Sequence, residues 1–309
     1  MEKKVKENGI IFIINDDNTL TSMTHYDYDS KKDVAIPHKF KTGEVIERIG
    51  MGFCSGIYGK VTISDEIKEV CAEAFFNASI QEVHWSSGCK TIPLKCFIYS
   101  GIQVISNIKD VNEIEEQAFA NSQIRTFSIP PMCKKIPKEC FRQSMLKQIS
   151  NTEKLESIEK GAFSCTVIDE FVWPAACDTI PERCFSGSSI RTISNIQNVK
   201  KVEESAFRGC SNLASFDWPQ NCIEIPPDCF SLSRMTAFSG FETVLLIGER
   251  AFYGAECCSG FDMSNSMILS IGREAFGGVF GEANTSKIIF PYYISSEEKQ
   301  RALALPKHK

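Results

Sequence analysis

A phenylalanine recurs about every 22 residues through most of this chain. The first seven intervals are 22 residues long, and the last three are 23, 22 and 24. A repeat of this length indicates stacked supersecondary units, each of which contacts only its neighbours. It predicts a solenoid with an extended surface and argues against a compact globule. The series is Phe53, Phe75, Phe97, Phe119, Phe141, Phe163, Phe185, Phe207, Phe230, Phe252 and Phe276.

Three further columns of the repeat are apolar in nearly every unit. They lie eight, five and one residues before the phenylalanine, and in the unit of Phe119 they are Val111, Ile114 and Ala118. From the second unit on, the residue immediately before the phenylalanine is alanine or cysteine. Positions that stay apolar at a fixed spacing point into a common interior, so these columns predict one continuous core.

Each phenylalanine is followed by a segment with the pattern of a strand. Ile124–Ile129 alternates apolar and polar residues at its end, and Pro130 closes it, as suits the end of a strand. The stretch before the ring, such as 114–119, has apolar spacing that fits a single helical turn. Each coil is therefore expected to be a strand, a turn, a short helical or irregular segment and a second turn. Successive strands should pair in parallel at about 4.8 Å.

A second period of about 44 residues is superimposed on the first. Units alternate between a Cys-Phe form, such as Cys184-Phe185, and an Ala-Phe form, such as Ala206-Phe207. The last strand position alternates with it between a large residue such as Trp173 and a small polar one such as Asn195. The alternation suggests packing between unlike coils, and the sequence leaves open whether each asparagine caps a turn.

The two ends lack the repeat and predict caps for the stack. The N-terminal part has strand patterns at Ile10–Ile14 and Leu20–Thr24 and an extended piece at Val34–Pro37. Near the other end, Ser295 followed by Glu298 is typical of a capping box that starts a short helix. The expected organisation is an N-terminal β cap at 1–44, a solenoid at 45–291 and a C-terminal capping tail at 292–309.

The repeat resembles the BspA-like class of leucine-rich repeats. That class carries an Ile-x-x-x-Ala-Phe core followed by a Leu-x-x-Ile-x-Ile-Pro strand, as in 114–130 and 202–219 of this chain. The opening segment 9–20 is similar to the family's N-terminal cap, and the Cys-Phe and Trp-Pro variants look like protist members. The resemblance covers nearly the whole chain and implies a right-handed leucine-rich repeat solenoid of about eleven coils, with a parallel sheet on one face.

The same resemblance implies a function in binding other proteins. Members of the family are regarded as surface antigens, adhesins or interaction proteins of bacteria and protists. A non-catalytic protein-protein interaction module, as a surface antigen or adhesin, is therefore the first interpretation, and an intracellular scaffold or adaptor is the alternative. The partner is expected to be a protein, whose identity the sequence does not reveal, and no small-molecule substrate is indicated.

The charge balance disfavours some partner classes. The chain has 34 basic and 39 acidic residues and no basic run, which disfavours nucleic acid and anionic membranes. The N-terminus is too charged for an ordinary signal peptide, and no stretch approaches the roughly 20 apolar residues of a membrane helix. A cytoplasmic location is expected on these grounds, with the cell surface or unconventional secretion as the alternative.

Fourteen cysteines raise the question of a metal site. Eight of them occupy two core columns, in which they alternate with valine, leucine or alanine as small buried hydrophobic residues do. Same-column cysteines lie two coils apart, about 10 Å by strand spacing, which is too far for a disulfide. Free buried thiols without metal or cofactor are therefore expected, and Cys257-Cys258 is the pair expected to be exposed or reactive.

Alternation along each strand places every second residue on an outward face that is small and weakly charged. Such a face would let a partner approach closely, although a plain solvated surface is an equally simple interpretation. The hypothetical binding residues on it are Glu82, His84, Thr126, Ser128, Gln148, Ser150, Glu170 and Val172.

A remote alternative places a hydrolase on the same strands. Ser106 is expected beside His84 on the next coil, with Glu82 two residues away on the strand of the histidine. No pattern marks an oxyanion hole or an enclosed pocket. Enzymatic activity is therefore not expected, and no catalytic residue is assigned.

Overall fold

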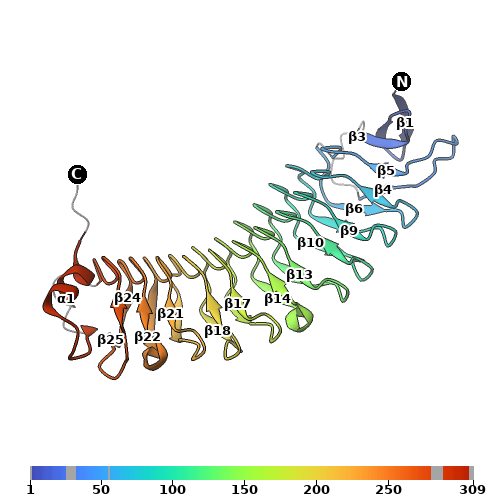
Figure 1. The fold of residues 1–309 in the computed structure, drawn as a ribbon. Helices are drawn as coiled ribbons and strands as arrows, with labels where there is room; N and C mark the ends of the chain where they lie inside the picture. The colour runs from blue at the N-terminus through green and yellow to red at the C-terminus, as the bar shows by residue number, and fades with distance from the viewer. Residues whose placement is uncertain (1, 26–32, 55, 280–287, 306–309) are drawn as a thin grey trace. The chain divides into compact units, whose positions relative to one another are not determined.

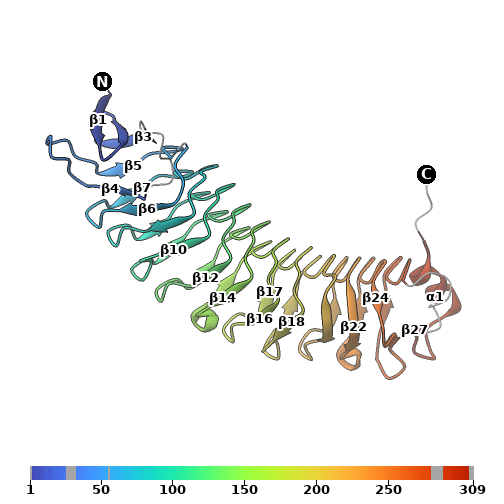
Figure 2. The same cartoon turned by 180° about the vertical axis from the view of Figure 1, so that it is seen from behind.

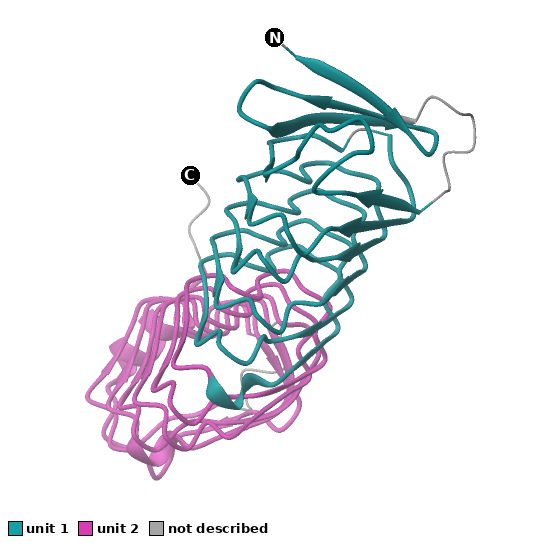
Figure 3. Cartoon of the chain, turned by 90° about the vertical axis from the view of Figure 1, so that its right-hand side faces the viewer, with its two compact units in different colours: residues 1–154 teal, residues 155–309 magenta. Residues whose placement is uncertain are grey.

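The computed structural model describes residues 2–25, 33–54, 56–279 and 288–305. By its internal contacts the chain divides into two compact units, residues 1–154 and 155–309 (Figure 3). Short strands recur along both units (Figures 1 and 2), and the chain is a β-solenoid with parallel strands and little helix. The phenylalanine repeat therefore predicted the fold class correctly. The domain boundaries expected after residues 44 and 291 remain predictions.

The strands that follow the phenylalanines, together with one that precedes the series, form what we call the first ladder. Within it the strands pair in parallel in groups of two to four, with equivalent residues side by side, for example Ser128 beside Ser150. Unit 1 contributes β4 (Val34–Ile36), β6 (Lys60–Ile63), β8 (Glu82–His84), β10 (Val104–Ser106), β12 (Thr126–Ser128) and β14 (Gln148–Ser150). Unit 2 contributes β16 (Glu170–Val172), β18 (Thr192–Ser194), β20 (Leu213–Asp217), β22 (Arg234–Ser239), β24 (Glu256–Cys257), β25 (Phe261–Asp262) and β27 (Ile288–Ile289).

A second ladder of two-residue strands precedes the phenylalanines, where a single helical turn was expected. That expectation was wrong, because the backbone of these segments bonds to neighbouring coils: the Glu115 amide, for example, donates to the Ile92 carbonyl of the preceding coil at 2.9 Å. In unit 1 the strands are β5 (Arg48–Ile49), β7 (Glu69–Val70), β9 (Thr91–Ile92), β11 (Glu113–Ile114) and β13 (Lys135–Ile136). In unit 2 they are β15 (Ser157–Ile158), β17 (Thr179–Ile180), β19 (Lys201–Val202), β21 (Glu224–Ile225), β23 (Leu246–Ile247) and β26 (Ser270–Ile271).

The backbone around each phenylalanine forms a ridge that also excludes a helix. From Phe75 to Phe276, the residues two before and two after the ring have positive φ, as at Gln117 (56°) and Asn121 (55°) around Phe119. The amides of Gln117, Phe119 and Asn121 all donate to carbonyls of the next coil, at 3.1, 2.9 and 2.7 Å. Left-handed conformations cost energy in residues other than glycine, so these bonds between coils offset the strain.

The core is a row of stacked phenylalanine rings in each unit. Phe97 and Phe119 stack at 5.3 Å with an angle of 8° in unit 1, and Phe207 and Phe230 stack at 5.4 Å and 6° in unit 2. All four side chains have no solvent-exposed surface. The rings keep this stacking across the 23-residue interval from Phe207 to Phe230, so the extra residue is accommodated elsewhere in the coil.

The 44-residue alternation is explained by packing between unlike coils. The indole of Trp173 donates to the carbonyl of Cys177 at 2.8 Å, and the Cys177 thiol donates to the carbonyl of Leu155 one coil earlier at 3.6 Å. In the next coil Asn195 takes the equivalent of the tryptophan position with a φ of 62°. Its side-chain amide donates to the Trp173 carbonyl at 2.7 Å. The tryptophan and asparagine coils are therefore complementary neighbours.

The N-terminal segment is an antiparallel sheet joined to the second ladder. It comprises β1 (Lys3–Glu7), β2 (Ile10–Ile14) and β3 (Thr19–His25), and β3 pairs in parallel with β5. The strand patterns at 10–14, 20–24 and 34–36 were confirmed, whereas the charged strand β1 was missed. The Met23 amide donates to the Phe53 carbonyl at 2.7 Å, so β3 occupies an acceptor of the first ridge.

A helix, α1 (Ser296–Leu303), lies against the last ridge. The capping box predicted at Ser295 is present, since its side chain accepts from the Glu298 amide and the Glu298 carboxylate accepts from the Ser295 amide. The carbonyls of Arg301 and Ala302 accept the amides of Glu274 and Phe276 at 3.0 and 2.9 Å. The carboxyl end of α1 thus supplies acceptors for ridge amides that would otherwise lack a following coil.

Candidate interaction surface

The structure places the eight predicted binding residues on the first ladder. Glu82 and His84 lie on β8, Thr126 and Ser128 on β12, Gln148 and Ser150 on β14, and Glu170 and Val172 on β16. The β8 pair is half-buried and the other six side chains are exposed. All eight therefore point away from the core, as alternation requires.

Unit 1 brings four of these residues into one hydroxyl-rich patch. Thr126 pairs with Gln148, and Ser128 pairs with Ser150, in the register of β12 and β14. The side-chain amide of Asn151 donates to the Ser128 hydroxyl at 2.8 Å. Small side chains in register leave a surface on which a partner could approach the sheet closely.

Nearer the N-terminal end of unit 1, His84 lies beside Ser106 as expected. The distance from His84 Nδ1 to Ser106 Oγ is 3.2 Å. Glu82, the third member of the remote hydrolase arrangement, forms an ion pair with Lys60, with 2.8 Å between Nζ and Oε1. Within the described residues Glu82 makes no hydrogen bond with His84, so these three residues do not form a relay.

On β16, in unit 2, the outward face carries charge and one apolar side chain. Glu170 and Asp169 both pair with Arg191, the latter at 3.2 Å. Val172 is 60 % exposed and lies opposite Ser194. An exposed valine among polar residues is a small apolar contact point on this face.

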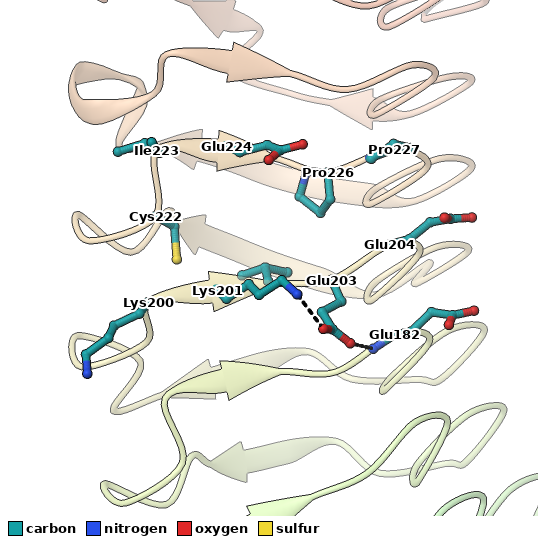
Figure 4. A pocket seen from close by; sticks show the side chains of 11 residues that line it. Glu182, Lys200, Lys201, Glu203, Glu204, Cys222, Ile223, Glu224, Pro226 and Pro227 are labelled. Carbon is teal, nitrogen blue, oxygen red and sulfur yellow. Dashed lines mark hydrogen bonds and ion pairs between the residues drawn. The ribbon is translucent and has the colours of Figure 1, made fainter.

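A groove on the second ladder was missed by the sequence reasoning. In unit 2 it has a volume of about 390 Å³ and lies between β19 and β21 (Figure 4). Lys201 pairs with Glu203 at 2.8 Å, and the other Glu203 oxygen accepts the Glu182 amide of the preceding coil at 3.1 Å. The pKa of the Glu203 carboxyl is held below its usual value, chiefly by the hydrogen bond from Lys201.

Unit 1 has an equivalent groove of about 780 Å³ around β11. There Glu115 accepts the Leu94 amide at 2.7 Å, as Glu203 accepts that of Glu182. The recurrence of a glutamate four residues before Phe119 and Phe207 was a signal in the sequence that could have located both grooves. These glutamates accept hydrogen bonds from backbone amides of the preceding coil, so their primary role is to stabilise the stacking of coils.

The thiols are mostly buried, as predicted, but one expectation is corrected. Burial raises the pKa of Cys177 and of Cys222 to about 11, so these thiols stay protonated at neutral pH. Of the pair expected to be exposed, Cys258 is exposed whereas Cys257 is buried. Cys257 points inward because β24 continues the alternation of the first ladder. Cys165, on a ridge, is a second exposed thiol that the sequence reasoning missed.

Comparisons with known proteins agree with this geometry. Residues 25–147 and 156–281 match the family described as BspA type leucine-rich repeat region, in six copies. The comparison with curated proteins finds no match. Across the described residues, the structure has no helix with the length and apolar character that crossing a membrane requires.

Solved structures with the same fold are distant in sequence. The pneumococcal vaccine antigen PcpA is 15 % identical, with a TM-score of 0.54 over 90 % of this chain and 79 % of that chain. A leucine-rich repeat protein from Bacteroides ovatus is 17 % identical, with a TM-score of 0.50 over 93 % and 95 % of the two chains. At such identity the likeness concerns the fold.

Proposed function

Because this chain belongs to the BspA-type leucine-rich repeat family, we propose that it is a non-catalytic module that binds a protein partner through the first ladder. The observation that carries this proposal is the in-register, exposed, hydroxyl-rich patch of Thr126, Ser128, Gln148 and Ser150. Solenoids of this kind offer extended surfaces for binding. In its finer form the contact also includes Glu82 and His84 in unit 1 and Glu170 and Val172 in unit 2.

Bulky substitutions on the patch test this contact. Ser128→Trp with Ser150→Trp should abolish capture of the partner from extracts and medium of the source cells, because two indoles would hold a partner off the sheet. The matched control is Asn112→Trp, an exposed residue that adjoins the second ladder of the same unit. Capture that survives in the double variant would exclude the patch as the contact.

The finer role is that of a surface antigen or adhesin, supported by the family resemblance. An intracellular scaffold is the second candidate, and the free thiols favour it because oxidising compartments promote disulfides. Labelling intact source cells with a membrane-impermeant amine reagent separates the two. A labelled protein supports the surface role, and labelling only after lysis supports the scaffold.

A further inference from the structure

The second ladder changes character in its last three coils. In all earlier coils the residue directly before each strand is charged or is asparagine: Glu47, Lys68, Lys90, Asn112, Lys134, Glu156, Asp178 and Lys200. In the last three coils this residue is Ile223, Leu245 and Leu269. With Leu246 on β23, these residues form what we call the apolar stripe. Ile223 is 54 % exposed and Leu269 is 71 % exposed.

The stripe is continuous within unit 2. The Leu245 amide donates to the Ile223 carbonyl, and the Leu269 amide donates to the Leu245 carbonyl, both at 2.8 Å. Leu246 pairs in register with Glu224 on one side and Ser270 on the other. Large aliphatic side chains are therefore exposed on three successive coils, and contiguous exposed apolar surface of this kind marks interaction sites.

Exposed acidic residues lie on the coils of the stripe and on the coil before it. Glu204, Glu224 and Glu249 are exposed, and none has a salt bridge within the part of the chain that the structure describes. Figure 4 shows Glu224 directly beside Ile223 and Glu204 at the other end of the groove.

The nearby basic residues, by contrast, are all engaged. Lys200 pairs with Asp178 at 3.4 Å, Lys201 with Glu203 at 2.8 Å, and Arg273 with Glu274 at 3.0 Å. Glu224 thus places a negative charge directly beside Ile223 in the stripe. A complementary partner presents apolar side chains with lysine or arginine beside them. An anionic membrane is disfavoured, because its charge has the same sign as that of the glutamates.

The spacing of the stripe selects the conformation of that partner. Neighbouring strands lie about 4.8 Å apart, so the aliphatic residues recur at about that interval along the stripe. Side chains on one face of a helix recur at about 5.4 Å per turn. Side chains on one face of an extended strand recur at about 6.7 Å, so such a partner would not stay aligned with the stripe over three coils.

We propose that the apolar stripe is the docking surface for an amphipathic helix of a partner protein, whose apolar face is flanked by lysine or arginine. Helices bind apolar grooves through side chains at i, i+3, i+4 and i+7, and that pattern fits three coils. The stripe belongs to the second ladder, so this inference is independent of the first-ladder contact.

Peptide selection tests the proposal while the partner itself is unidentified. A displayed library of random peptides of about 18 residues, or five helical turns, is depleted on the full-length Ile223→Ser/Leu269→Ser variant and then selected on the wild-type chain. We expect enriched peptides to be basic, to carry the helical apolar pattern, and to gain helical circular dichroism on binding. Enrichment of acidic or strand-patterned peptides, or of none that distinguish the two proteins, would overturn the proposal.

Affinity measurements on one enriched peptide sharpen the test. Fluorescence anisotropy should show at least about tenfold weaker binding to the serine variant, a loss of about 1.4 kcal/mol. Glu204→Gln/Glu224→Gln/Glu249→Gln should also bind more weakly and with less dependence on salt. The Ser128→Trp/Ser150→Trp variant should bind as the wild type does. Equal affinity for the serine variant contradicts the proposal.

A second copy of the chain is the competing occupant. Sedimentation equilibrium of the wild type and of the serine variant distinguishes it from a separate partner. We expect both proteins to have the same mass across a concentration series. A dimer that the serine substitutions dissolve would overturn the proposal in favour of self-association.

Discussion

The side-chain amide of Asn195 donates a hydrogen bond of 2.7 Å to the main-chain carbonyl of Trp173, one coil earlier. Asn107 makes the same bond to the Trp85 carbonyl at 2.8 Å in unit 1. Asparagine suits this position for two reasons: it tolerates a left-handed backbone conformation, and its side-chain N–H group can donate a hydrogen bond. The relationship shows that the 44-residue period serves packing.

Asn195→Ala should lower the stability by about 1–3 kcal/mol, since it leaves the Trp173 carbonyl unpaired and puts alanine at a φ of 62°. Asn195→Gly should cost less, because glycine adopts that conformation freely. Urea unfolding of the three proteins measures the difference. Equal losses in the two variants would show that backbone strain contributes nothing at this position.

Phe207→Ala should cost about 3–5 kcal/mol, because it empties a fully buried site between Phe185 and Phe230. Phe207→Leu should cost clearly less, since it keeps most of the volume. Thermal melts followed by circular dichroism compare them. An unchanged midpoint in the alanine variant would contradict the role of the stacked rings in the core.

Gly248→Glu should destabilise the chain even though glutamate stands at the equivalent position in Glu115 and Glu203. Those glutamates accept amides of the preceding coil, whereas the residue facing Gly248 is Pro227, which has no amide hydrogen. A Cβ at Gly248 would lie 2.4 Å from the Pro227 nitrogen. We expect a loss of about 1–3 kcal/mol in urea unfolding.

The matched control is Glu203→Gln, which preserves an acceptor for the Glu182 amide and should be nearly neutral. If Gly248→Glu were as stable as the wild type, the close approach of the coils at Pro227 would be excluded.

Maleimide should label Cys165 and Cys258 rapidly in the native protein, because these two thiols are exposed. Cys71, which is half-buried, should react more slowly. Buried thiols such as Cys89, whose pKa burial raises to about 11, should react only after unfolding, since the thiolate is the reactive form. Mass spectrometry of tryptic peptides reports each site, and rapid native labelling of Cys89 would contradict the burial.

Ser295→Ala should loosen the attachment of α1 by about 1 kcal/mol, because it removes the capping box. The amides of Glu274 and Phe276, which donate to the end of α1, should then exchange faster with deuterium. The amide of Phe207, far from the helix in sequence and bonded to Cys229, is the internal control. Unchanged exchange at Phe276 would show that α1 does not protect the last ridge.

Much of the candidate surface was also readable from the sequence. Alternation placed Ser128, Ser150 and the other predicted residues outward, and it placed His84 beside Ser106. The sequence did not predict that Glu82 pairs with Lys60 and not with His84, because Lys60 lies in the preceding coil. The apolar stripe was visible as a change from Lys200 to Ile223, but its exposure was not.

The sequence by itself determined the repeat, the core columns and the family, because a buried ring every 22 residues constrains each coil in the same way. Only the tertiary structure decided what the segments before the rings become. Their spacing of apolar residues fits a helical turn, yet amides such as that of Phe119 bond to the next coil. The alternation of Trp173 and Asn195 likewise acquires its meaning only across coils. The physical reason is common to both: stacking supplies hydrogen-bond partners 21 or 22 residues away, and no local pattern records which of them a backbone group will use.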